Sequence, residues 1–193
     1  MWRALLLTLL ISINTVEADN LTAIAEQLQT PALLQGSFSQ HKHIRILSAP
    51  LVSGGVFSIV RDYGVIWGIK EPMQTQLLIT ENGVIGEDVD NDRAMAYIGR
   101  ILKHILSGEL SALQKQFDIT LTDSEQYDWA LQMKPRSAIL GRAINRIELA
   151  GDTHIRRLVL HEAEGDRTEI RFFDFSHSDR VDSDISDVFP SSR

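Results

Sequence analysis

The sequence predicts a mainly β fold of the α+β class, with a strongly curved antiparallel sheet or open barrel and helices laid over its mouth. Three observations predict it. Roughly ten short apolar runs follow one another with turn residues between them. Two helical patterns interrupt this β sequence near the middle of the chain. A tryptophan, Trp67, stands inside one of the strands, and its size calls for a large apolar space on one side of the sheet.

The rest of the chain is organised around residues 54–72. Two β-branched, apolar runs, 56–60 and 65–69, flank the turn residues Asp62, Tyr63 and Gly64, and Pro72 closes the second run. This pattern predicts a hairpin that carries Trp67. We therefore expect the sheet to curve around a space, which either side chains or a ligand would fill.

The first 18 residues have the pattern of a secretory signal peptide. Arg3 is followed by an almost wholly apolar run at 4–13, and Val16 and Ala18 stand at the positions that signal peptidase reads. The run is shorter than the about 20 residues of a spanning helix. We expect cleavage after Ala18 and a single mature domain at 19–193; the alternative is an uncleaved N-terminal anchor.

Composition limits the partners of this domain. The chain has a formal net charge of −7, which argues against nucleic acid and against anionic membranes as partners. It contains no cysteine, so Asp19 cannot carry the acyl group of a lipoprotein. The sequence therefore predicts an exported protein that is soluble in the periplasm and not anchored to a membrane.

The early elements follow from local patterns. Leu21, Ile24 and Leu28 recur at helical spacing, which predicts a helix at 19–30 that ends before Pro31. Residues 34–47 predict a long strand. Within it, His41 and His43 share one face, but no third ligand is near, so a solvated strand end is favoured over a metal site.

The middle of the chain combines a hairpin with two helices. The dipeptide Asn82-Gly83 between the runs 75–80 and 84–87 predicts a tight hairpin. Residues 94–106 predict the clearest helix of the chain, with a broad apolar stripe on one side, and 109–117 predict a second, short helix.

Strands return in the last third of the chain. We expect them at 119–122, 127–133, 143–150, 153–161 and 166–175, with a loop at 134–141 and a polar, acidic tail from 176 onward. Alternation of apolar and polar residues is good between Ile155 and Phe173.

No catalytic motif is present. The chain has no nucleophile elbow, phosphate loop or zinc-protease helix. A triad could be drawn from His161, Asp174 and Ser176, with His177 adjacent, but alternation along a strand explains their positions as well. A small hydrolase therefore remains only an alternative.

The order of several short motifs resembles the outer-membrane lipoprotein carrier proteins, the LolA-like periplasmic chaperones. Ser37-Phe38-Ser39-Gln40 is similar to the S-F-x-Q strand of the family, and Arg61, Trp67 and Pro72 are similar to its R-x5-W-x4-P run. The turns at 82–83, 151–152 and 165–166 and the helical segment that ends at 106–110 also fit. The resemblance covers most of residues 19–175.

This resemblance implies an unclosed barrel of about eleven antiparallel strands with a helical lid over a hydrophobic cavity. The cavity would hold the acyl chains of a lipoprotein or lipid cargo, and the family is not enzymatic and uses no cofactor or metal. It also implies an inner-membrane donor, an outer-membrane acceptor and a monomeric carrier. Arg61 matches an arginine that helps to hold the lid shut. The candidate lining residues are Phe38, Phe57, Ile59, Trp67, Ile69, Leu77, Ile79, Met95, Ile98, Ile101, Leu102 and Ile105.

Two alternatives share this fold. One is a lipid-binding sensor or regulatory module, and the other is a carrier dedicated to a specialised glycolipid or lipid export system. The sequence departs from the family after Pro190, where family members usually continue with a further strand-forming piece, so donor and acceptor partners could differ.

Overall fold

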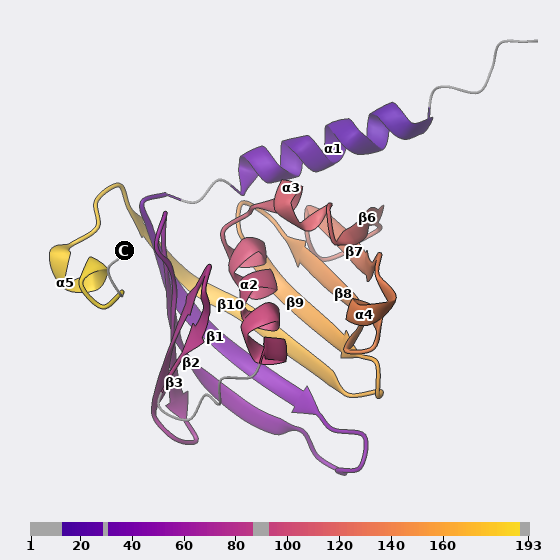
Figure 1. Ribbon diagram of the computed structural model, residues 1–193. Helices are drawn as coiled ribbons and strands as arrows, with labels where there is room; N and C mark the ends of the chain where they lie inside the picture. The colour runs from indigo at the N-terminus through magenta and orange to yellow at the C-terminus, as the bar shows by residue number, and fades with distance from the viewer. Residues whose placement is uncertain (1–12, 29–30, 87–92, 190–193) are drawn as a thin grey trace, which may run out of the picture.

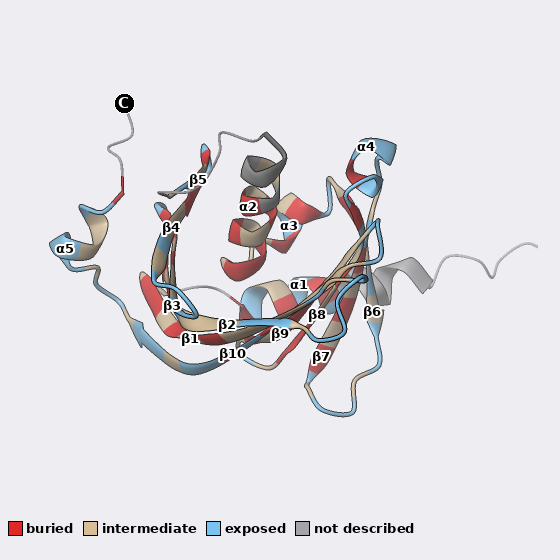
Figure 2. Ribbon diagram, turned by 90° about the horizontal axis from the view of Figure 1, so that it is seen from below, coloured by how far each residue is buried: buried red, intermediate tan, exposed pale blue. Residues whose placement is uncertain are grey.

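The computed structural model describes residues 13–28, 31–86 and 93–189. In these residues ten antiparallel strands form one sheet, in the order β5-β4-β3-β2-β1-β10-β9-β8-β7-β6. The sheet bends into a deep, open trough around the helix α2 (Figures 1 and 2). This arrangement confirms the predicted mainly β fold with an unclosed sheet and a helix over its hollow. The resemblance implied about eleven strands, and the described residues contain ten.

The first half of the chain builds one wall of the trough. The predicted hairpin around Trp67 is confirmed, because β2 pairs with β3 and places Phe57 opposite Trp67. At the start of this hairpin the two strands approach so closely that a Cβ on Gly55 would lie 1.9 Å from the carbonyl oxygen of Gly68. The strands of this wall are β1 Leu33–His43, β2 Leu51–Val60, β3 Gly64–Glu71, β4 Thr75–Thr80 and β5 Gly83–Ile85.

The last third of the chain builds the other wall. Strand β10 pairs with β1 and so joins the two halves of the sheet. A register shift in that pairing coincides with a positive φ of 53° at Asp174. The strands of this wall are β6 Phe117–Thr122, β7 Trp129–Pro135, β8 Ile144–Gly151, β9 Ile155–Glu162 and β10 Arg167–Ser178.

Two helices differ from the sequence expectation. Helix α1 covers Ile13–Gln27, so it begins before the predicted 19–30 helix and contains the predicted cleavage position. The expected helix 109–117 is only the short α3, Leu110–Leu113, because Phe117 instead begins strand β6 opposite Pro135. Burial of the Phe117 side chain in the trough, where it is fully inaccessible, overrides the helical spacing.

Three other helices complete the fold. Helix α2, Arg93–Leu106, matches the predicted 94–106 helix and lies in the trough. A short α4, Ala138–Gly141, forms in the expected loop 134–141, where the Ser137 hydroxyl accepts a hydrogen bond from the Leu140 amide at 3.2 Å. The tail folds back as α5, Ser183–Ser186. Among the described helices, none has both the length and the apolar character needed to cross a bilayer.

The core fills the concave side of the sheet. Alternate residues of each strand point into the trough, as the burial pattern of β7, with Trp129, Leu131 and Met133 buried, shows. Helix α2 presents Ile101 and Ile105 to this surface, and both are buried. Figure 2 shows buried residues along the strands of the trough and on α2, whereas the turns are mostly exposed. Helix α2 thus stands where a ligand would compete with it for apolar surface.

Candidate functional site

Helix α2 divides the hollow into a packed side and an open side. Strands β1 to β3 and β10 fill the packed side with aromatic rings. The rings of Phe38 and Trp67 stack with centroids 3.9 Å apart, and Phe57 meets the edge of Phe172 at 5.4 Å. This close packing leaves no room for an acyl chain between these rings.

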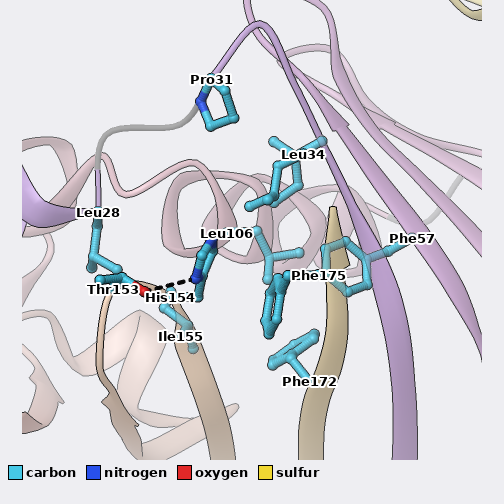
Figure 3. A pocket seen from close by; sticks show the side chains of 11 residues that line it. Leu28, Pro31, Leu34, Phe57, Leu106, Thr153, His154, Ile155, Phe172 and Phe175 are labelled. Carbon is cyan, nitrogen blue, oxygen red and sulfur yellow. Dashed lines mark hydrogen bonds between the residues drawn. The ribbon is translucent and has the colours of Figure 1, made fainter. Parts of the chain in front are cut away.

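A small cavity remains at the end of the packed side, close to the end of α1 (Figure 3). Its volume is about 40 Å³, which is enough for only a few water molecules. The ring of Phe175 borders it, stacks with the ring of His154 at 4.4 Å and lies 4.7 Å from the guanidinium of Arg156. Burial lowers the pKa of His154, which favours its neutral form in this stack.

The open side is a larger cavity between α2 and strands β8, β9, β10 and β1. Its volume is about 500 Å³, within the range of about 300–1,000 Å³ that is usual for small-molecule sites. The helix contributes apolar side chains on one side, and the strands form an apolar floor opposite. This floor consists of Ile144, Ile147, Leu158, Leu160 and Ile170.

The rim of this cavity is polar and carries both signs of charge. Lys42 and Glu162 form an ion pair across it with an N–O distance of 3.2 Å. Arg142 and Glu164 also border the opening. The arrangement is amphipathic: aliphatic chains fit inside, and a polar head would meet charged and hydrogen-bonding groups at the rim.

The C-terminal end of α2 is fastened by charged side chains. The Lys103 ammonium is buried, and it donates a short hydrogen bond to Glu81 in the β4–β5 turn and lies 3.5 Å from Glu109. His104 contacts the second oxygen of Glu109 at 2.7 Å. The hydrogen bond from Lys103 is the main reason why the pKa of Glu81 is lowered. We call these four side chains, Glu81, Lys103, His104 and Glu109, the charged latch.

Further contacts hold the two ends of α2, the helix that covers the trough as a lid. The Tyr97 hydroxyl donates a short hydrogen bond to Gln116, just before β6. At the other side, Gly108 follows α2 with a φ of +70°, and a Cβ there would lie 2.5 Å from the carbonyl oxygen of Leu28. The helix is therefore bonded to the β4–β5 turn and to the residue before β6, and its C-terminal end lies close to Leu28.

The family model of the outer membrane lipoprotein carrier protein LolA matches residues 29–186. The chain belongs to the LolA family. A curated outer-membrane lipoprotein carrier protein from Halorhodospira halophila is 24% identical over 186 residues, which cover 93% of this chain and 86% of the relative.

Solved structures similar to this chain include two proteins. A LolA superfamily protein from Nitrosomonas europaea matches with a TM-score of 0.48 and 11% identity, covering 92% of this chain and 99% of its own. The MucA/MucB complex of Pseudomonas aeruginosa contains a match with a TM-score of 0.50 and 15% identity, covering 86% of this chain and 59% of its own. At 15% identity, the match in the MucA/MucB complex supports the fold alone.

In this LolA family member the predicted lining residues separate into groups. Ile101, Leu102 and Ile105 line the larger cavity, and Phe57 and Ile59 border the small one. Phe38, Trp67 and Ile79 belong to the packed core, and Ile69 and Leu77 pack against it. The side chains of Met95 and Ile98 are not among those that the structure describes.

Sequence reasoning missed the floor formed by β8, β9 and β10. The alternation between Ile155 and Phe173 was the signal for it, because this pattern assigns Leu158, Leu160 and Ile170 to one face. The alternation alone does not show that α2 packs against β4 and β5 and leaves this side open.

Arg61 lies at the end of β2, beside the C-terminal end of α2. Together with Ser107, Gly108 and Glu109 it borders a surface hollow, and its amide donates to the carbonyl oxygen of Ala32 at 3.0 Å. Its side chain is exposed, and its role as a latch stays a prediction. The charged latch lies at the same end of the helix.

The alternative triad is not assembled by the fold. His161 pairs with Arg167 at one end of β10, whereas Ser176 pairs with Gln35 toward the other end. At about 3.3 Å per residue these positions are roughly 30 Å apart along the strand. The triad of His161, Asp174 and Ser176, on which the hydrolase alternative depended, is therefore not formed.

One group of potential metal ligands occurs among the described residues. Glu81, His104 and Glu109 bring ligand atoms within 4.8 Å of one another. The Lys103 ammonium already contacts both carboxylates, and its positive charge opposes a cation at this place. His41 and His43 are not part of any such group within the described chain.

Proposed function

We propose that this protein is a periplasmic carrier that shields the acyl chains of a lipoprotein, or of another lipid-modified cargo, during transfer to the outer membrane. The observation that carries the proposal is the cavity of about 500 Å³ between α2 and the strands β8 to β10, apolar inside and charged at its rim. Membership of the LolA family supports it.

The energetics of such a site suit a carrier. Each methylene group removed from water contributes about 0.8 kcal/mol, so even part of one acyl chain gives useful affinity. Displacement of α2 would add the apolar surface that Ile101 and Ile105 now cover. The cavity in the closed form is thus the first place that a chain occupies, and the lid sets how much more of the trough becomes accessible.

The remaining parts of the proposal follow from the sequence. Residues 1–18 direct export as a cleaved signal peptide, and 19–193 form the carrier domain. An inner-membrane donor loads the protein and an outer-membrane acceptor unloads it, and no enzymatic step or cofactor is involved. A glycolipid cargo would use the same cavity, and the identity of the bound lipid would distinguish it from a lipoprotein. A lipid-sensing module of this fold would also use this cavity.

The first experiment is native mass spectrometry of the protein purified from periplasm, followed by lipid extraction. Stoichiometric acylated species are expected, and their identity gives the cargo class. An empty protein that also fails to take up a fluorescent fatty acid would contradict the proposal.

A matched pair of variants locates the site. Leu160→Gln places an amide in the cavity, and we expect about tenfold weaker uptake of the fluorescent fatty acid because a polar group is buried against the chain. Leu121→Gln is the control, since Leu121 is also partly buried and packs against the core without lining this cavity. Equal uptake by both variants would place the binding site elsewhere.

A further inference from the structure

Four connections of the sheet lie at one end of the molecule, which we call the mouth end. They are residues 44–50, 72–74, 136–143 and 163–166. The register places them together, because Lys42 pairs with Leu51, His43 pairs with Arg167, and Ile144 pairs with Glu162. In Figure 1 the hairpin β1–β2 extends beyond the turn β9–β10 at this end, and Figure 2 looks onto it from below.

The mouth end exposes aliphatic side chains to an unusual degree. Ile46 and Ile139 are each 83% exposed, and Met73 is 73% exposed. Leu47, Leu51 and Val52 are exposed beside Ile46, so the β1–β2 hairpin ends in four exposed aliphatic residues. We call these four residues the aliphatic tip.

The opposite end of the sheet differs in character. Its connections are residues 61–63, 81–82, 123–128 and 152–154, and each contains at least one carboxylate. Within these fully described connections Tyr63 is the exposed large hydrophobic residue. Exposed apolar surface on loops is therefore concentrated at one end, and such concentrations mark sites of contact with another apolar phase or partner.

The aliphatic tip is joined to the rim of the larger cavity. The Arg45 amide donates to the Asp166 carboxylate at 3.0 Å, which fixes the tip to the β9–β10 turn. The same turn contributes Glu164 to the rim, and the root of the hairpin contributes Lys42, which pairs with Glu162. The exposed tip and the cavity opening are thus two parts of one surface.

Resting on the carrier function proposed above, we infer that the aliphatic tip inserts into the surface of a lipid bilayer at the moment of loading or release. An acyl chain could then pass between the bilayer and the cavity without crossing water. Contact at this end would place the rim, with Lys42 and Glu162, at the level of the lipid headgroups.

Two observations favour a lipid surface over a protein partner. The exposed large hydrophobic residues of the hairpin and the neighbouring loops include no Trp or Tyr, although Arg45 is exposed beside them, whereas the residues that dominate protein interfaces are mainly Trp, Tyr and Arg. Four side chains on a protruding hairpin are also far fewer than the roughly 20–30 residues that each side of a stable interface contributes. The net charge of −7 opposes lasting adhesion to anionic lipid, so the contact would be apolar and brief, as a carrier requires.

The test measures partitioning of the purified protein onto vesicles of neutral phosphatidylcholine by flotation. The wild type is expected to bind, with little dependence on salt. The double variant Ile46→Ser, Leu47→Ser is expected to bind at least about tenfold more weakly, because two exposed aliphatic side chains no longer leave water. Tyr63→Ser, at the opposite end, is the matched control and should bind like the wild type.

Two further measurements separate this inference from folding and from the carrier function. The melting temperature of the double variant should stay unchanged, since both side chains are exposed, and its uptake of fluorescent fatty acid from solution should also stay unchanged. Failure of the wild type to float, or equal flotation of wild type and double variant, would overturn the inference while fatty-acid uptake still reports on the cavity. Cargo transfer that is lost without a change in flotation would point to a protein partner and would likewise overturn it.

Discussion

Removing either member of the Lys103–Glu81 pair should affect the lid in opposite ways. Glu81→Gln leaves the buried Lys103 ammonium with Glu109, 3.5 Å away, as its remaining carboxylate. Breaking a buried pair in this way costs about 3–5 kcal/mol. The Glu81 side chain is 59% exposed, so solvent screening reduces the expected loss to about 1–2 kcal/mol.

The variant Lys103→Met removes the charge itself and keeps most of the side-chain volume. The lysine is 7% exposed, so its ammonium loses much of its hydration in the closed form. Replacing buried charges with apolar groups of similar size is often neutral or stabilising, by about 1–4 kcal/mol. Lys103→Met should therefore keep the lid at least as well closed as in the wild type.

Hydrogen exchange of the α2 amides measures this difference. Glu81→Gln should speed their exchange about five- to thirtyfold, which corresponds to the expected loss of about 1–2 kcal/mol. Lys103→Met should leave the exchange unchanged or slow it. If Lys103→Met instead opened the lid more than Glu81→Gln does, the ion pair would be a net stabilising contact and the reasoning from desolvation would be refuted.

Three more predictions follow from particular contacts. The hydrogen bond from Lys103 lowers the pKa of Glu81, so the stabilising effect of Glu81 is present above the ordinary pKa of 4.5 and is lost as the pH falls through the lower pKa of the folded state. Hydrogen exchange of the α2 amides, corrected for its intrinsic rate, should accelerate in that pH range in the wild type but not in Glu81→Gln. Gly108→Ala should lower the free energy of unfolding by about 1–3 kcal/mol, because φ is +70° and the new Cβ would meet the Leu28 carbonyl; denaturant titration checks this, and a neutral result would contradict it. Phe38→Ala should cost about 3–5 kcal/mol by removing the ring that stacks on Trp67, and calorimetry should show a melting temperature lower by about 10 °C; a fall of only a degree or two would mean that the rings do not pack as described.

Local patterns were sufficient to predict most of the strands. The hairpin around Trp67 and the turn at Asn82-Gly83 carry turn residues between apolar runs, and both appear where they were expected. Phe117 shows where local reasoning fails. Its spacing from Leu113 fits a helix, but burial in the trough and pairing with Pro135 place it in a strand. Long-range packing decides such cases, and a single sequence does not display it.

The candidate site was predictable only in part. Ile101, Leu102 and Ile105 of the apolar stripe of α2 border the larger cavity, and their role in binding stays a prediction. Trp67 indicated a large space in the same way, but Phe38 stacks on it and fills that space. Whether a hollow is open depends on how a helix tilts against two walls, and hydrophobic periodicity carries no information on that tilt.

The chain order gives the lid a further property. Helix α2 follows β5 and leads through α3 to β6, and these two strands are the unpaired edges of the sheet. In the carrier proposed above, the helix is therefore a competitor covalently linked to the apolar surface that it covers, at a high effective concentration that dilution cannot lower. For the part of an acyl chain that needs the surface under α2, the apparent affinity would fall in proportion to the fraction of molecules in which the helix has moved aside, so each 1.4 kcal/mol of closure would weaken that part of binding about tenfold. Residues outside the cavity, such as Glu81, would in this way set how readily the proposed cargo is released.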